Sequence, residues 1–404
     1  MLDGDPFRYF ADLLVLMVIA VPAFFLAPFA WLRQLILGLT GAYLTFLIAP
    51  RLLLFFVLFW LGIFVLQHAA ALWRDQRASW VWTTVLIVAA LAPMVLWKLF
   101  PEWFVTGFNL RMDRGVAWLS PWVGSIDRVR DIILPIGLSF ATFRAVDQLI
   151  KVRLEIVPAL TPLQQLAYSF FPSVLVIGPV IEYTEIDQGL RNRQRWNAED
   201  TLSGILTVAL GAFKVFVIAY LLRGSQDVFA LRTHSGSALD YWLELVMFAL
   251  YFYFNFAGYS DMAIGCARVF GFRLAPNFNN PYLKANPQEF WNSWHMSLTR
   301  FAQRNVFVPM GGMRARTQYA AIVATMMVIA LWHDLSIPLV IFGIYHSTGL
   351  VLHRMWTARR PVPRPRPLPR RIGANAALFL FVLVSLPLLN LELSAVPTFY
   401  GRLL

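Results

Sequence analysis

Residues 51–73 read RLLLFFVLFWLGIFVLQHAAALW. Positions 52–73 contain no Asp, Glu, Lys or Arg, and about 20 apolar residues in a helix suffice to cross the hydrocarbon core of a bilayer. This segment therefore predicts a membrane-spanning helix. Apolar runs of similar length recur at 12–30, 35–49, 80–99, 132–150, 164–182, 203–222, 239–256, 317–334, 337–356 and 373–390. The pattern predicts an all-α, polytopic integral membrane protein with about eleven transmembrane helices.

The overall composition points the same way. Of 404 residues, 59% are apolar and 14% charged, whereas ordinary soluble domains carry roughly 25% charged residues. This excludes a soluble enzyme, a disordered protein and a nucleic-acid binder, despite a net charge of +12. The excess of Lys and Arg is typical of cytoplasmic loops and of contacts with anionic lipids of the bilayer. The first run, near Asp12, lacks a small-residue cleavage signal and predicts a retained helix, not a signal peptide.

The chain reads as one membrane domain over 1–404. Its basic charge concentrates in three segments between spans, and no internal repeat is visible, which weakens an inverted-repeat transporter. Alternating prolines favour an extended segment in the last basic stretch, either a surface linker or a docking site for a partner. The expected divisions are N-terminal helices at 1–130, a core at 131–356, a basic Pro-rich linker at 357–372, and a final transmembrane helix and tail at 373–404.

Residues 257–312 differ from the rest because polar and aromatic side chains alternate closely. Irregular backbone at membrane depth persists only where it is buried in protein or lines a watery cavity. This stretch is therefore the first place to look for a site. Within it the spacing predicts one amphipathic helix, with Gln288, Asn292, His295 and Thr299 on its polar face. Such a helix would lie on the membrane surface or face an internal cavity.

Three histidines are candidates for chemistry: His295, His333 and His346. His333 interrupts an apolar run, and a break near Pro338 would let the flanking helices pack side by side. A buried neutral imidazole can accept a proton, although a hydrogen-bonded core histidine is the structural alternative. The spacings match no compact metal-ligand motif, no Gly-x-Ser-x-Gly elbow occurs, and Cys266 lies among small residues typical of helix packing. We therefore predict no metal site.

Two further polar groups have expected structural roles. Asp261 or its neighbour Ser260 would cap the start of a helix, because short oxygen-bearing side chains are preferred there. The amides of Asn277, Asn279 and Asn280 would satisfy the irregular backbone around them.

Several of these motifs together resemble the membrane-bound O-acyltransferase (MBOAT) superfamily. They are LPIGLSF at 134–140, FP at 171–172, FAGYSDMAIG at 256–265, NFNNPY at 277–282, EFWN at 289–292, WHMSL at 294–298 and LWH at 331–333. Two bacterial branches are the nearest, the teichoic-acid D-alanyl transfer proteins (DltB) and the alginate O-acetylases (AlgI). YHSTGLV at 345–351 leans to the first and VPMGG at 308–312 to the second. The chain departs from the family pattern at Ser293-Trp294, Gln303-Arg304 and Asp334.

The resemblance implies transfer of a D-alanyl or acetyl group from a cytosolic thioester to a hydroxyl of an extracytoplasmic cell-envelope polymer or carrier. The donor would be an acyl-carrier protein or acyl-CoA, used as a substrate with no resident cofactor, and a partner acyltransferase is a further expected contact. The protein would lie in the bacterial inner membrane, with its site in a central funnel or tunnel bordered by re-entrant helices.

The resemblance also implies roles for individual residues. His333 would take the proton of the acceptor hydroxyl, and His295 would position a substrate or stabilise the tetrahedral oxygen. The expected substrate-binding residues are Asn292, Trp291, Asp261 and His346. The alternative is a non-catalytic transporter or flippase, or an assembly subunit of an envelope-modifying system.

Overall fold

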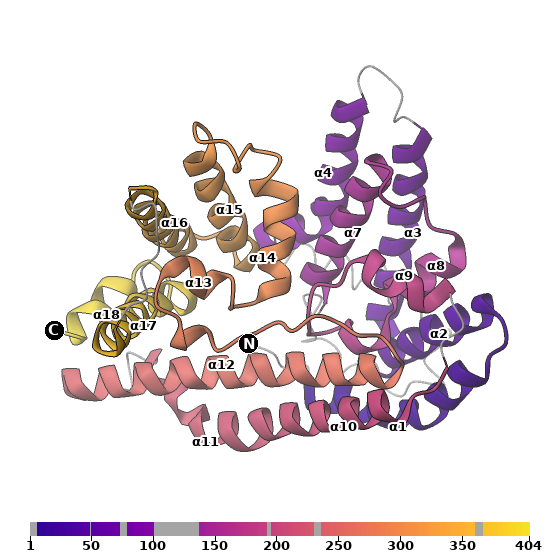
Figure 1. The fold of residues 1–404 in the computed structure, drawn as a ribbon, viewed down its shortest axis with the longest axis horizontal. Helices are drawn as coiled ribbons and strands as arrows, with labels where there is room; N and C mark the ends of the chain where they lie inside the picture. Colours follow the sequence, from indigo (N-terminus) through magenta and orange to yellow (C-terminus); the bar gives the residue numbers. More distant parts are fainter. Residues whose placement is uncertain are drawn as a thin grey trace. The chain divides into compact units, whose positions relative to one another are not determined.

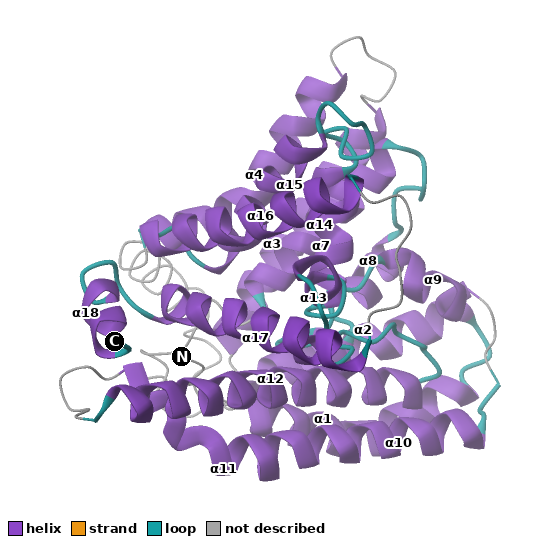
Figure 2. Ribbon diagram, turned by 60° about the vertical axis from the view of Figure 1, so that its left-hand side comes forward, coloured by secondary structure: helices purple, strands orange, loops and turns teal. Residues whose placement is uncertain are grey.

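The described part of the chain is helical throughout. The computed structural model describes residues 6–48, 50–72, 79–100, 137–191, 195–229, 236–359 and 367–404, and no strand occurs among them (Figures 1 and 2). The predicted all-α class is confirmed for these residues. The basic segment 111–130, the motif residues 134–136 and residues 360–366 of the Pro-rich linker lie outside the described residues.

The helices form two compact units, one comprising Met1–Val208 and Met262–Leu274, the other Ala209–Asp261 and Ala275–Leu404. Helices α10 and α12 contribute residues to both. The first unit contains α1 (Pro6–Leu26), α2 (Ala30–Ile48), α3 (Pro50–Leu72), α4 (Ser79–Leu99), α7 (Leu138–Arg153), α8 (Pro162–Ser169), η3 (Pro172–Val174), α9 (Tyr183–Arg191) and most of α10 (Ala198–Phe213).

In the first unit, α2 packs against α1 and α8, while α7 packs against α3 and α4. Arg144 of α7 is fully buried, and its guanidinium donates to the backbone oxygens of Tyr168 at 2.9 Å and Ser169 at 3.3 Å. These carbonyls lie at the C-terminal end of α8, where unpaired backbone oxygens attract a cation. Arg144 also lies over the ring of Trp60, 5.3 Å from its centroid. One buried cation thus joins α7 to the end of α8.

The second unit carries the candidate site. It contains η4 (Lys214–Ala219), α11 (Tyr220–Leu222), η5 (Arg223–Phe229), most of α12 (Ala238–Val269), η6 (Pro281–Leu283), α13 (Pro287–Trp291), α14 (Met296–Ala302), η7 (Gln303–Phe307), α15 (Gln318–His333), α16 (Ile337–Ala358), α17 (Leu368–Asn390) and α18 (Val396–Arg402).

Helices α15 and α16 form an antiparallel pair (Figure 1). The chain leaves α15 at His333, turns through Asp334–Ser336, and re-enters helix at Ile337 with Pro338 in the first turn. Gly343 allows close approach, because a Cβ there would lie 3.2 Å from Cβ of Ala330 on α15. The predicted break near Pro338 and the side-by-side packing are confirmed.

Within the described ranges, six helices are long and apolar enough to cross a membrane. They cover Arg8–Leu26, Ala30–Ile48, Leu53–Leu72, Val81–Leu99, Ala198–Ser225 and Leu368–Asn390. Each overlaps an apolar run of the sequence. Helix α15 is a shorter apolar helix. The chain is a multi-pass membrane protein.

The structure corrects three local expectations. Residues 164–182 are not one helix: α8 ends at Ser169, because Pro172 lacks the N–H that would continue it and Gly178 has φ 142°. The single amphipathic helix expected around 288–299 is two short helices, α13 and α14. Asp261 does not stand at a helix start, because α12 runs without a break from Ala238 to Val269.

Candidate active site

His295 lies between the two short helices in a strained conformation. It is the N-cap of α14, with φ 43° and ψ 55°, a left-handed conformation that L residues other than glycine rarely adopt. This conformation ends the helical path that the sequence pattern predicts. Strained backbone of this kind persists only where the surrounding structure enforces it, and it is often found at functional sites.

Asn277 enforces the turn. Its backbone oxygen accepts from the N–H of Met296 at 2.8 Å, and its side-chain oxygen accepts from the N–H of Ser297 at 3.0 Å. Its amide nitrogen donates to Ser260 Oγ on α12 at 3.1 Å. The expectation that this amide satisfies irregular backbone is confirmed. The result places the His295 imidazole against the ring of Phe256, with centroids 4.8 Å apart at 82°.

His333 is the last residue of α15, and its ring contacts that of the preceding Trp332, with centroids 4.6 Å apart and the planes tilted by 58°. Trp332 in turn lies edge-on to His295 at 6.0 Å. Two histidines from segments nearly forty positions apart are therefore brought to one place. His333 stands at the helix end because Asp334 is already extended.

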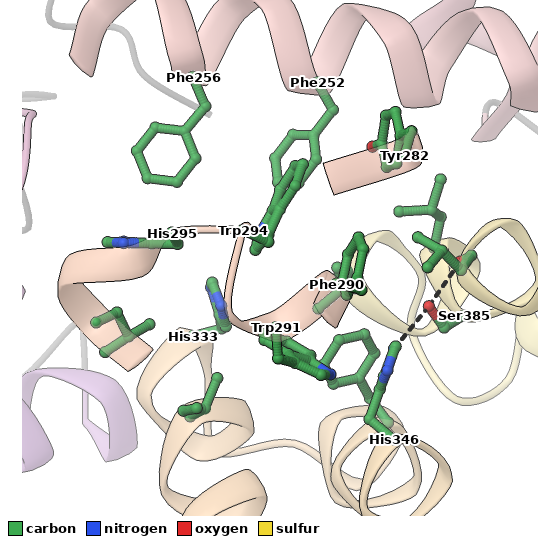
Figure 3. A pocket seen from close by; sticks show the side chains of 16 residues that line it. Phe252, Phe256, Tyr282, Phe290, Trp291, Trp294, His295, His333, His346 and Ser385 are labelled. Atoms are coloured by element: carbon green, nitrogen blue, oxygen red, sulfur yellow. Dashed lines mark hydrogen bonds between the residues drawn. The ribbon is translucent and has the colours of Figure 1, made fainter. Parts of the chain in front are cut away.

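Both histidines line one cavity in the second unit, which together with its opening to solvent holds about 550 Å³ of empty space (Figure 3). Its wall is mostly aromatic and aliphatic, and its polar atoms belong to three histidines, one serine, one tyrosine and two tryptophans. The lining residues are Phe252, Phe256, Tyr282, Phe290, Trp291, Trp294, His295, Leu298, Ile329, His333, Phe342, His346, Val382, Ser385, Leu386 and Leu389. An apolar pocket with a few convergent polar groups is the usual form of a small-molecule site.

The His295 imidazole is electrically neutral. It is 2% exposed and lies outside the six candidate spans, and burial lowers its pKa to about 3, with a smaller effect from the nearby His333. A neutral imidazole both donates and accepts a hydrogen bond. Its Nδ1 lies 3.4 Å from Ser297 Oγ, a hydroxyl that donates to Asn277. His295 can therefore serve a reacting group without carrying a charge.

His346 and Trp291 line the same cavity as the two candidate catalytic histidines. Their rings meet edge to face at 5.2 Å, and His346 Nε2 lies 3.0 Å from Ser385 Oγ of α17 (Figure 3). Four of the six residues predicted for the site thus share one cavity wall.

Asn292 and Asp261 are not among the residues that line this cavity. Asn292 is exposed, and its Oδ1 lies 3.5 Å from Nε2 of Gln303. Asp261 forms an ion pair with Lys214, with 2.5 Å between Oδ2 of Asp261 and Nζ of Lys214. Their predicted role in substrate binding stays a prediction.

Sequence reasoning missed Ser385 and Lys214. Ser385 lies in an apolar run with no motif around it, so only the packing of α17 against α16 shows its partner. Lys214 had a usable signal, because a cation inside an apolar run is costly and marks a partner or a site. Among the described residues no group of three His, Cys, Asp or Glu is arranged to hold a metal ion.

The sequence of this chain is similar to those of several known proteins. The chain is 31% identical over 332 residues to a probable alginate O-acetylase of Azotobacter vinelandii, covering 81% of this chain and 61% of the relative. It is 27% identical over 346 residues to a peptidoglycan O-acetyltransferase of Helicobacter pylori, covering 75% and 63%. The chain thus spans about three fifths of the length of these two relatives.

A third relative is matched over most of its length. The chain is 25% identical over 382 residues to a teichoic acid D-alanyltransferase of Streptococcus thermophilus, covering 88% of this chain and 84% of the relative. The profile of the MBOAT, membrane-bound O-acyltransferase family matches residues 43–396, a range that contains every residue of the cavity. The chain therefore belongs to the membrane-bound O-acyltransferase family.

Proposed function

We propose that this protein transfers an acetyl group from a cytosolic thioester to a hydroxyl of an extracytoplasmic cell-envelope polymer. The observation that carries the proposal is that His295 and His333 line one aromatic cavity. The relatives' names support the class of acceptor, since they refer to alginate, peptidoglycan and teichoic acid.

The reaction assigns a separate task to each histidine. The acceptor oxygen attacks the thioester carbonyl carbon while its proton passes to the His333 imidazole. The tetrahedral intermediate then collapses, the C–S bond breaks, and the imidazolium returns the proton to the thiolate. His295, held neutral by burial, supplies a hydrogen bond to the developing oxyanion, a type of contact worth about 10²–10³ in kcat.

The wall of the cavity favours acetyl over D-alanyl. A D-alanyl ester carries an ammonium group, and a buried cation needs a paired anion. None of the lining residues is Asp or Glu. An acetyl group needs no such partner, because it is small, neutral and apolar at its methyl end.

Other parts of the proposal rest on the family resemblance. The donor is an acyl-carrier protein or acyl-CoA, and a partner acyltransferase receives or relays the product. The protein lies in the bacterial inner membrane, with about eleven spans around a funnel that joins the cytosolic donor to the outer acceptor. Asn292 and Asp261 contact substrates on the approach to the cavity.

The direct test is acetyl transfer in vesicles containing only the purified protein, an acetyl thioester and a polysaccharide acceptor. H333A should abolish ester formation at unchanged protein level. H68A is the matched control, because His68 does not line the cavity and bonds the backbone oxygen of Phe64 at 2.8 Å. Full ester formation by H333A would refute the assignment. Passage of the thioester or acceptor across the vesicle without ester formation would identify a transporter instead.

A further inference from the structure

A further group of polar side chains lies on the part of the cavity wall formed by α13, α16 and α17 (Figure 3). It consists of Trp291, His346 and Ser385 and is called the polar station. His346 and Trp291 are 1% and 8% exposed. Each has a buried ring nitrogen, Nδ1 of His346 and Nε1 of Trp291, without a hydrogen-bond partner among the described residues. A buried polar atom without a hydrogen-bond partner destabilises the fold, so two such atoms on one wall call for an explanation.

Ser385 determines which nitrogen of His346 carries the hydrogen. The Ser385 hydroxyl donates to the backbone oxygen of Val382 at 2.7 Å. A hydroxyl has one hydrogen, so Ser385 Oγ can only accept from His346 Nε2, 3.0 Å away. In the neutral ring Nε2 is therefore protonated, and Nδ1 presents a lone pair.

The station consequently offers one acceptor, His346 Nδ1, and one donor, the indole N–H of Trp291, which has no lone pair to offer. Their rings are 5.2 Å apart at 84°. A hydroxyl fits this pair, because it donates its hydrogen to Nδ1 and accepts from the indole. A carboxylate cannot donate to Nδ1, and an ammonium cannot accept from the indole. No lining residue is charged to balance either ion.

We propose that Trp291 and His346 bind a second hydroxyl of the acceptor, apart from the hydroxyl that receives the acyl group. The inference rests on the proposed function and narrows its substrate class to polyols, such as sugar units with neighbouring hydroxyls. Ser385 acts as a positioning residue, since it sets the tautomer of His346 and does not itself contact the acceptor.

Binding is tested first, in the H333A protein labelled with 15N-histidine, so that the result does not depend on chemistry. Cyclohexane-1,2-diol should shift the Nδ1 resonance of His346, identified by its loss in H346F. Methylcyclohexane, which has the same ring and no hydroxyl, should leave it unshifted. Equal responses to both compounds, or none to the diol, would overturn the proposal. S385A should convert the spectrum to a mixture of tautomers.

Kinetic measurements on the active protein then test the contribution of the acceptor's second hydroxyl, apart from the hydroxyl that is acylated. The wild type should use the diol with a KM about tenfold below that for cyclohexanol, the gain expected from one well-placed hydrogen-bonded group. W291F and H346F should remove this preference, so that the KM for the diol rises to that for cyclohexanol. W196F and H68F are controls, because both residues lie outside the cavity lining.

The outcomes distinguish this inference from the proposed function. A preference for the diol that survives W291F and H346F means that the pair holds only water, and the inference fails. A diol-dependent shift of Nδ1 in a protein that forms no ester from any acceptor leaves the binding station standing, while the proposed acyl transfer fails.

Discussion

The side-chain oxygen of Asn277 accepts two hydrogen bonds from Ser297, from its backbone N–H at 3.0 Å and from its hydroxyl at 2.9 Å. Ser297 lies in the first turn of α14, two positions after His295. Through Ser260 Oγ the same amide reaches α12. One asparagine thus fixes the position of a candidate catalytic histidine relative to the long helix opposite it.

N277A should loosen the His295 turn and lower both stability and activity. The change leaves buried partners on Ser260 and Ser297 unpaired, which costs about 1–3 kcal/mol per group. We expect a lower thermal unfolding midpoint in detergent and a kcat reduced at least tenfold. N279A is the matched control, because Asn279 is exposed and uses only its backbone N–H, which bonds Ser293. Equal losses in both variants would contradict the assigned role.

Replacements of His295 should separate backbone strain from chemistry. The left-handed φ of 43° costs alanine roughly 1 kcal/mol more than glycine, and asparagine is also tolerated there. H295G and H295N should therefore unfold at higher temperature than H295A. H295G and H295A should both lose acyl transfer, about 10²–10³-fold, since neither side chain can donate a hydrogen bond to the oxyanion. An H295G protein that retains wild-type kcat would show that His295 is only structural.

The pH dependence of stability carries a further signature of His295. Burial lowers its pKa from 6.5 to about 3 in the folded protein, so between these values the unfolded chain binds more protons. Stability therefore rises with pH across this window and falls as the solution is acidified from 6.5 toward 3. H295N should show a shallower loss of unfolding midpoint over the same range. An unchanged slope would mean that His295 is not held neutral by burial.

Much of the candidate site could be predicted from the types of its residues and the sequence around them. Histidines inside apolar runs, such as His333 and His346, are expensive to bury and therefore stand out. The structure brings both to one cavity wall with His295 and Trp291. Six of the eleven predicted spans overlap helices of the described chain that are long and apolar enough to cross a membrane, since length and apolar composition decide these.

The remaining features depend on tertiary contacts that periodicity does not encode. Residues around 288–299 have helical spacing, yet the chain breaks at His295 because Asn277, far back in the sequence, supplies hydrogen bonds to the turn. The sequence predicts a helix start near Asp261 because polar residues follow an apolar run there. The continuous α12 tolerates it because Lys214 pairs with it from η4.

The ion pair between Lys214 and Asp261 gives a last prediction. Nζ of Lys214 lies 2.5 Å from Oδ2 of Asp261, and the two side chains are 21% and 26% exposed. Lys214 is the first residue of the π-helical segment η4, which lies inside a candidate span. Removing one partner of such a pair leaves the other charge poorly solvated, whereas removing both costs much less. D261N should therefore lower the unfolding midpoint more than the double variant K214M/D261N.

Activity of the same variants tests whether Asp261 also binds substrate. If the carboxylate serves only the ion pair, the double variant should recover acyl transfer together with stability. If Asp261 contacts the acceptor or donor as the sequence predicts, KM should stay raised in the double variant although its unfolding midpoint has recovered. The comparison needs thermal unfolding and initial rates of the wild type, D261N and K214M/D261N. Stability and KM both recover in the double variant in the first case, whereas only stability recovers in the second.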